Sequence, residues 1–253
     1  MDAVSDESAI TSCPREKPVS TAQRPVPGRN EATMTDDELR HQVAAELSWD
    51  PQVDSEVIEV SADSGTVTLR GTVDSLRQKR AGSKAATRVR GVIQVACELV
   101  VRIPGGDQRD DDDLRGDVLE ALMLDGSVPM TVDAQVRDGL VTLTGTVQWH
   151  YQREEAESRT AQVPGVVRID NAITLARTDA GDAGDAVAAI TAAFRRNAVL
   201  EADELWVERY SGGLVILSGT VSSWAGHDHA VAAAWSAPGV MQVDDRISVE
   251  NTQ

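Results

Sequence analysis

Four cationic side chains lie at nearly helical spacing in residues 76–90, LRQKRAGSKAATRVR. They are Arg77, Arg80, Lys84 and Arg88. At about 100° per residue they form one stripe, roughly opposite Gly82, Ala86 and Val89. A row of cations on a helix can meet anionic lipid headgroups, with about 1 kcal/mol per residue near the surface. We therefore predict a contact surface for anionic phospholipid. A solvated outer face is the alternative interpretation.

Tryptophan is over-represented among the aromatic residues, with five Trp against one Phe and two Tyr. Trp49 follows a predicted first helix, whereas Trp149 and Trp224 each begin a second helix. Trp206 and Trp235 fall inside predicted elements. A tryptophan at the end of a loop can anchor a protein at a bilayer interface or at a partner. We predict that Trp49 joins the lipid contact and that Trp149 and Trp224 contact a partner protein. Rings that cover the edge of a small core are the alternative.

Residues suited to metal binding or catalysis form no specific pattern. The pair His227-x-His229 has no third ligand at a typical spacing, and Cys13 and Cys97 form no disulfide or metal framework. The run Asp110–Asp113 lacks the glycine and final glutamate of a calcium loop, and suits the start of a helix. No nucleophile elbow, phosphate loop or carboxylate pair recurs along the chain. We predict no metal site, no cofactor and no enzyme activity.

The net charge of −17 argues against nucleic acid as a partner, because the phosphate backbone would be repelled. This charge is unevenly distributed, with −2 in 36–103, −7 in 111–176 and −5 in 184–250. No apolar run approaches the length of a membrane-spanning helix. The N-terminal residues show no secretory signal, so we expect a cytoplasmic protein with peripheral membrane contact.

One turn-and-strand segment occurs three times. Residues 64–73 read SGTVTLRGTV, 138–147 read DGLVTLTGTV and 212–221 read GGLVILSGTV. Three sets of glycines keep an interval of 74 residues throughout. They are Gly65, Gly139 and Gly213; Gly71, Gly145 and Gly219; and Gly91, Gly165 and Gly239. We therefore predict a domain of about 65–70 residues that is present three times.

Each copy begins with apolar residues at helical spacing, preceded by acids that suit a helix start. These residues are Leu39, Val43 and Leu47; Leu114, Val118 and Leu122; and Val187, Ile190 and Phe194. Alternating apolar residues around the turn glycine then predict two strands, followed by a second helix and a last strand. The predicted fold class is α+β: three tandem αββαβ domains, each a small three-stranded sheet covered by two helices.

By the alternation of side chains along a strand, Gly71, Gly145 and Gly219 belong to the same face as the apolar residues of their strands. We expect each of them to leave a gap on the core face, so that a helix can approach the sheet. Small residues on the second helix supply the matching surface. They are Gly82, Ala86 and Val89; Ala156, Thr160 and Val163; and Ala230, Ala234 and Ala237.

The repeats define the boundaries of the domains. The three domains are predicted at 36–103, 111–176 and 184–250. Polar segments connect them, and these flexible linkers are 104–110 and 177–183. The first 35 residues are rich in Pro, Ser, Thr, Arg and Glu, which predicts a disordered tail.

The repeat is similar to the BON domain, named after bacterial OsmY and nodulation proteins. The second copy carries the resemblance, DGLVTLTGTVQWHYQREEAESRTAQVPGVVRIDNAITL. Its pattern is a dG-x-V-x-L-x-G-x-V segment followed about 18 residues later by a GV-x-x-V-x-N-x-[IL]-x-V strand. The other copies differ at Asn171, which is replaced by Cys97 and Asp245.

The resemblance implies a non-catalytic protein associated with osmotic and envelope stress that contacts phospholipid surfaces. Our first hypothesis is therefore an OsmY-like stress protein whose three modules bind weakly and gain avidity together. The alternative is a scaffold for protein interaction or for sensing a small ligand or ion, with no membrane role. The acidic second and third copies suit that alternative.

Overall fold

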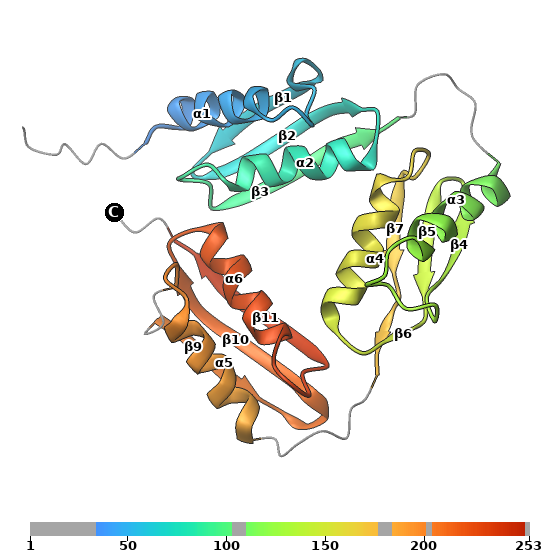
Figure 1. The fold of residues 1–253 in the computed structure, drawn as a ribbon. Helices are drawn as coiled ribbons and strands as arrows, with labels where there is room; N and C mark the ends of the chain where they lie inside the picture. The colour runs from blue at the N-terminus through green and yellow to red at the C-terminus, as the bar shows by residue number, and fades with distance from the viewer. Residues whose placement is uncertain (1–33, 103–109, 177–183, 201–203, 251–253) are drawn as a thin grey trace, which may run out of the picture. The chain divides into compact units, whose positions relative to one another are not determined.

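The chain folds as three copies of one helix–strand–strand–helix–strand unit (Figure 1). The structure, a computed structural model, describes residues 34–102, 110–176, 184–200 and 204–250. The order of elements and the small sheets confirm the predicted α+β class. The predicted tail and both predicted linkers lie almost entirely outside the described residues.

The helices and strands follow the same order in each domain. The first contains α1 (Asp36–Trp49), the 3-10 turn η1 (Ser55–Val57), β1 (Ile58–Asp63), β2 (Thr66–Val73), α2 (Leu76–Thr87) and β3 (Gln94–Val101). The second contains α3 (Asp111–Met123), β4 (Asp133–Arg137), β5 (Leu140–Thr144), β6 (Thr146–Val147), α4 (His150–Gln162), β7 (Arg168–Asn171) and β8 (Thr174–Leu175). The third contains α5 (Gly184–Arg196), β9 (Leu205–Arg209), η3 (Ser211–Gly213), β10 (Leu214–Val221), α6 (Trp224–Trp235) and β11 (Gln242–Val249).

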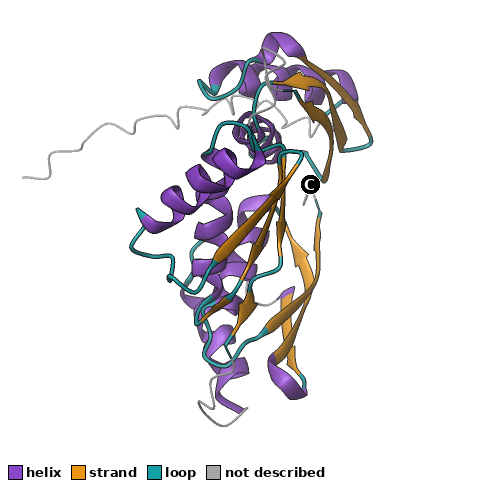
Figure 2. Ribbon diagram, turned by 90° about the vertical axis from the view of Figure 1, so that its right-hand side faces the viewer, coloured by secondary structure: helices purple, strands orange, loops and turns teal. Residues whose placement is uncertain are grey.

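The second strand in chain order is the middle strand of each sheet. β2 pairs antiparallel with β1 and parallel with β3, and β10 pairs in the same way with β9 and β11. In the second domain β5 lies between β4 and β7, and the parallel ladder continues past Gly145 as the pair β6–β8. Within a domain the helices lie on one side of the strands, which leaves the other face of the sheet uncovered by helices (Figure 2).

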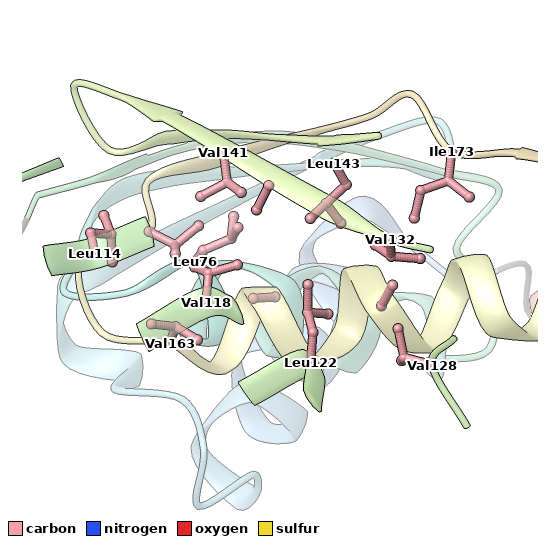
Figure 3. Close-up of a cluster of buried hydrophobic side chains, with 14 of the residues drawn as sticks. Leu76, Leu114, Val118, Leu122, Val128, Val132, Val141, Leu143, Val163 and Ile173 are labelled. Atoms are coloured by element: carbon pink, nitrogen blue, oxygen red, sulfur yellow. The ribbon is translucent and has the colours of Figure 1, made fainter. Parts of the chain in front are cut away.

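The apolar side chains on one face of each sheet are buried against the two helices of the same domain. In the second domain, Leu114, Val118 and Leu122 of α3 form one cluster with Val141 and Leu143 of β5 (Figure 3). The corresponding predicted positions of the first domain are also buried. In the third domain Ile190 and Phe194 are buried, whereas Val187 is only partly so. The helical and strand periodicities therefore identified the core correctly.

The acids at the helix starts do more than favour the helix dipole. Thr35 and Glu38 form a capping box at α1, and the Asp110 side chain caps α3. In addition, Asp36 accepts the N–H of Ser64 at 2.8 Å, and Asp111 accepts that of Asp138 at 3.0 Å. Both donors lie in the hairpin turn with φ near +50°. A helix-start carboxylate thus holds the strained turn of the same domain.

The gap that each repeat glycine leaves is filled by backbone, so the prediction that a helix occupies it is wrong. Gly71, Gly145 and Gly219 have φ of +143°, +135° and +127°. A Cβ on Gly71 would overlap the carbonyl oxygen of Val57, and one on Gly145 would overlap that of Thr131. The chain entering the first strand of the hairpin thus crosses directly over the glycine. The position requires glycine for both its conformation and its space.

We expect Gly145→Ala to lower the free energy of unfolding of the second domain by about 3 kcal/mol or more, since strain and overlap add. Thr144→Ala changes an outward-facing side chain on the same strand and should cost less than about 1 kcal/mol. Hydrogen exchange of β5 amides in the full chain measures both. Equal losses for the two variants would contradict this role of the glycine.

Gly82 on α2 should behave in the opposite way. A Cβ there would lie 3.6 Å from both Ile58 Cδ1 and Leu99 Cδ1, which is ordinary contact. The equivalent residues of the other domains are already alanine, Ala156 and Ala230. Gly82→Ala should therefore raise the stability of the first domain by about 0.5–1 kcal/mol through helix propensity. Thermal or denaturant unfolding followed by α2 amide exchange checks this, and a loss of stability would mean that the helix lies closer to the sheet than described.

Candidate functional site

The predicted basic stripe lies on the outer side of α2. The inner side of this helix is buried through Leu76, Gly82, Ala85 and Ala86. Three of the four predicted cations are exposed and Arg80 is partly exposed. The Ser75 hydroxyl accepts the N–H of Gln78 at 3.2 Å and fixes the start of the helix. The stripe is therefore held on a rigid element that is packed on one side.

The two ends of the stripe form hydrogen bonds with the end of α1 and with the segment that follows it. Arg88 donates to Glu46 at 2.9 Å and to Asp50 at 2.8 Å. At the other end, Arg77 donates from two nitrogens to the Gln52 side chain, at 3.4 and 3.5 Å. Lys84, between them, forms no ion pair with a residue that the structure describes. Arg88 thus links α2 to the end of α1, whereas Lys84 has no such link among the described residues.

The Asp50–Arg88 pair is charged at neutral pH. The hydrogen bond from Arg88 lowers the pKa of Asp50 below its ordinary value, and the N–H of Gln52 adds to this effect. A carboxylate with a lowered pKa in the folded state stabilises the fold above its ordinary pKa. That contribution is lost as the pH falls through the lowered value.

Trp49, the other residue of the predicted lipid contact, is 83% exposed. It is the last residue of α1, and its neighbours in sequence include Glu46, Asp50 and Gln52, the three acceptors of Arg88 and Arg77. The structure therefore places hydrogen-bond acceptors of the stripe next to Trp49 in the chain, although Trp49 and Arg77 are 28 residues apart. A ring exposed to this degree does not cover the core.

The two tryptophans predicted as partner contacts lie in different domains. Trp149 is the N-cap residue of α4 and is 43% exposed. Trp224 is the first residue of α6; it is partly buried and meets His227 edge-on, with ring centroids 4.9 Å apart. Neither lies beside a basic stripe of its own helix, because α4 carries only two arginines and α6 carries no Lys or Arg. Their role as partner contacts stays a prediction.

His227 forms an interaction that the sequence analysis missed. Its Nε2 lies 2.7 Å from Asp245 Oδ2 on β11, whereas His229 is exposed. Among the described residues, no three His, Cys, Asp or Glu side chains come together in a group able to hold a metal ion.

The same helix-to-strand link exists in every domain with different chemistry. The position of His227 is held by Lys79 and Arg153 in the other copies, and each donates to the third strand. Lys79 reaches the carbonyl of Leu99 at 2.7 Å, and Arg153 reaches that of Asn171 at 3.3 Å. The interval of 74 residues, applied to polar positions as well as glycines, would have revealed it.

Comparison with known proteins agrees with the repeated fold. The BON domain family model matches residues 35–103, 110–177 and 182–251. The chain is 33% identical over 145 residues to Osmotically-inducible protein Y of Escherichia coli (strain K12), covering 54% of this chain and 71% of that protein. Two solved structures of CdsD, a structural protein of the type III secretion system of Chlamydia trachomatis, are each 13% identical. They give TM-scores of 0.23 and 0.24, covering 84% of this chain and 98% and 92% of theirs.

No helix within the described parts of the chain has both the length and the apolar character needed to cross a bilayer.

The different roles of Arg88 and Lys84 can be measured. Arg88→Gln removes two acceptor pairs and should lower the stability of the first domain by up to about 1 kcal/mol, because the pair is partly solvent-screened. Lys84→Gln should leave stability unchanged. The difference between wild type and Arg88→Gln should shrink as acid protonates Asp50, and denaturant unfolding at several pH values tests this. If the difference in stability between the two proteins did not change with pH, the stabilisation by Arg88 would not come from its ion pair with Asp50.

Proposed function

Because the chain belongs to the BON domain family, we propose that it is a non-catalytic stress protein whose first domain contacts anionic phospholipid surfaces. The observation that carries the lipid contact is that the basic face of α2 is hydrogen-bonded to the residues next to the exposed Trp49 in the chain. The association with osmotic stress is supported by the similarity to an osmotically inducible protein. Apart from the threonine at 72, 146 and 220, the residues shared by the three copies are apolar or glycine, which supports a binding scaffold rather than an enzyme.

The proposed contact is peripheral and reversible. Arg77 and Lys84 would each contribute about 1 kcal/mol close to an anionic leaflet, and the indole of Trp49 would lie at the headgroup level. Arg80 would contribute less, because Glu157 already pairs with it. The first domain is also the least acidic, with a net charge of −2 against −7 and −5. Long-range repulsion from the membrane is therefore weakest where the cations are. Such a contact weakens as salt screens it.

A protein-interaction or ligand-sensing scaffold is the second candidate. The half-exposed Trp149 on the acidic second domain favours it, because aromatic residues are enriched at protein interfaces. Binding of this kind would be retained without lipid. Native mass spectrometry of the full chain, before and after Trp149→Ser, would show whether a bound partner or small ligand depends on this ring.

The lipid contact is tested by co-sedimentation with vesicles of phosphatidylglycerol and phosphatidylcholine. The triple variant Arg77→Gln/Arg80→Gln/Lys84→Gln should lose at least tenfold in apparent affinity, since about 2 kcal/mol or more of attraction is removed. Trp49→Ser should weaken binding further, and 0.5 M salt should reduce binding of the wild type. Arg88 is left unchanged because it stabilises the domain.

A second triple variant controls for net charge. Arg102→Gln/Arg137→Gln/Arg168→Gln removes the same charge from exposed positions away from α2. It should bind vesicles nearly as well as the wild type. Equal binding by the wild type and the α2 variant would exclude the proposed surface. If both triple variants lost vesicle affinity equally, the loss would follow from the net charge of the protein and not from the position of the cations on α2.

A further inference from the structure

The first strand of the third domain carries aromatic residues where the other domains carry charged ones. Trp206 pairs with Ser218, the residue before the repeat glycine. At the same register the other domains have Glu59 and Asp133. Four residues on, Tyr210 corresponds to Asp63 and Arg137 by the register of the antiparallel strand pair. Trp206 is 60% exposed and Tyr210 51% exposed.

These aromatic residues lie on the face of the sheet that no helix of the domain covers. Leu205 of β9 is buried, and so are Val215 and Leu217 of β10, which form the core face. Because side chains alternate along a strand, Trp206 and Glu208 point to the opposite face. The third domain therefore differs from the other two domains by exposed aromatic side chains on its uncovered sheet face, and not by its core.

β9 is also an edge strand. It is the last strand in the order β11-β10-β9, and no described strand pairs with its outer side. The N–H of Tyr210 donates to the carbonyl of Leu214 at 2.8 Å, toward β10. By the alternation of an antiparallel ladder, Val207 and Arg209 direct their N–H and C=O groups outward. The edge thus offers unpaired backbone groups to an incoming strand.

Edge strands are usually protected from such pairing by charged side chains. β1 has Glu59, Ser61 and Asp63 on its outward parity, and β4 has a charged or polar residue at each equivalent position. In β9 only Glu208 remains charged between the two rings. The protection found in the first two domains is therefore reduced in the third.

The charge on this surface is negative. Glu208 accepts the Tyr210 hydroxyl at 3.0 Å and forms no ion pair with any residue in the described ranges. On the same face, Arg246 is already neutralised by Asp244 at 2.7 Å. The third domain as a whole carries −5. A partner that covers this edge should therefore be positively charged.

We propose that the β9 edge binds an extended, positively charged protein segment as a fourth strand of the third domain's sheet. Backbone pairing would occur with Val207 and Arg209, and a Lys or Arg of the segment would face Glu208. Trp206 and Tyr210 lie about 13 Å apart along the strand, at about 3.3 Å per residue. That separation is too large for a cage around one small cation, but it matches side chains four residues apart on an extended chain.

The test uses the full chain and an acetylated octapeptide in which lysine and valine alternate. In ¹⁵N NMR titrations the peptide should shift the amides of Val207 and Arg209 and the Trp206 indole. The variant Trp206→Asp/Tyr210→Arg introduces the residues found at these positions in the second domain, so the fold should tolerate them. It should weaken binding at least tenfold, and Glu208→Gln should weaken it severalfold. Amide exchange of β10 confirms that each variant is folded.

Three controls decide the mode and the occupant. The same peptide with every backbone nitrogen methylated has no N–H on either edge, so it cannot pair as a strand and should not bind. A glutamate–valine peptide should not bind either. Binding retained by the methylated peptide or by the aromatic variant would overturn the proposal. Failure of the lysine–valine peptide to bind would also overturn it. A concentration-dependent dimer in sedimentation, lost in Trp206→Asp/Tyr210→Arg, would identify a second copy of the chain as the occupant instead.

Discussion

The contact between a repeat glycine and the backbone that crosses it is the constraint on which each domain depends. In the first domain the carbonyl of Val57 lies where the Cβ of Gly71 would be, and the second domain repeats this arrangement at Thr131 and Gly145. This contact sets where the first strand enters the sheet, and therefore the register of the hairpin. The hairpin register decides which side chains face the helices and which face outward. The surfaces proposed to bind partners are consequences of that choice.

The three domains keep this constraint and differ on their surfaces. The first has a basic helix face and an exposed Trp49, and the third has Trp206 and Tyr210 on the open side of its sheet. Even the polar link between second helix and third strand changes, from Lys79 to Arg153 to His227. Duplication followed by surface change gives one chain several distinct contact surfaces without altering the packing that folds them.

Periodicity in the sequence was sufficient to predict the elements and the core, because burial imposes a regular pattern at residues such as Leu39, Val43 and Leu47. The family was predicted from the resemblance of the repeated motif. It did not reveal what fills the space above Gly71, since a backbone carbonyl leaves no signal in residue type. The stripe on α2 was predictable from helical geometry. Its hydrogen bonds to the residues next to Trp49 were not, because they depend on the packing of α1 against α2. The role of Arg88 likewise required knowing where Glu46 and Asp50 lie.

If the first domain contacts an anionic surface as proposed, Arg88 would connect that contact with the stability of the domain. Its guanidinium is held by Glu46 and Asp50, yet 44% of the side chain is exposed on the basic face. A dense anionic surface competes with those two carboxylates for the same cation. To the extent that it succeeds, the end of α1 would be released from α2. Binding to the surface would then lower the stability of the first domain. By thermodynamic reciprocity, conditions that tighten the carboxylate contacts must weaken adhesion in equal measure.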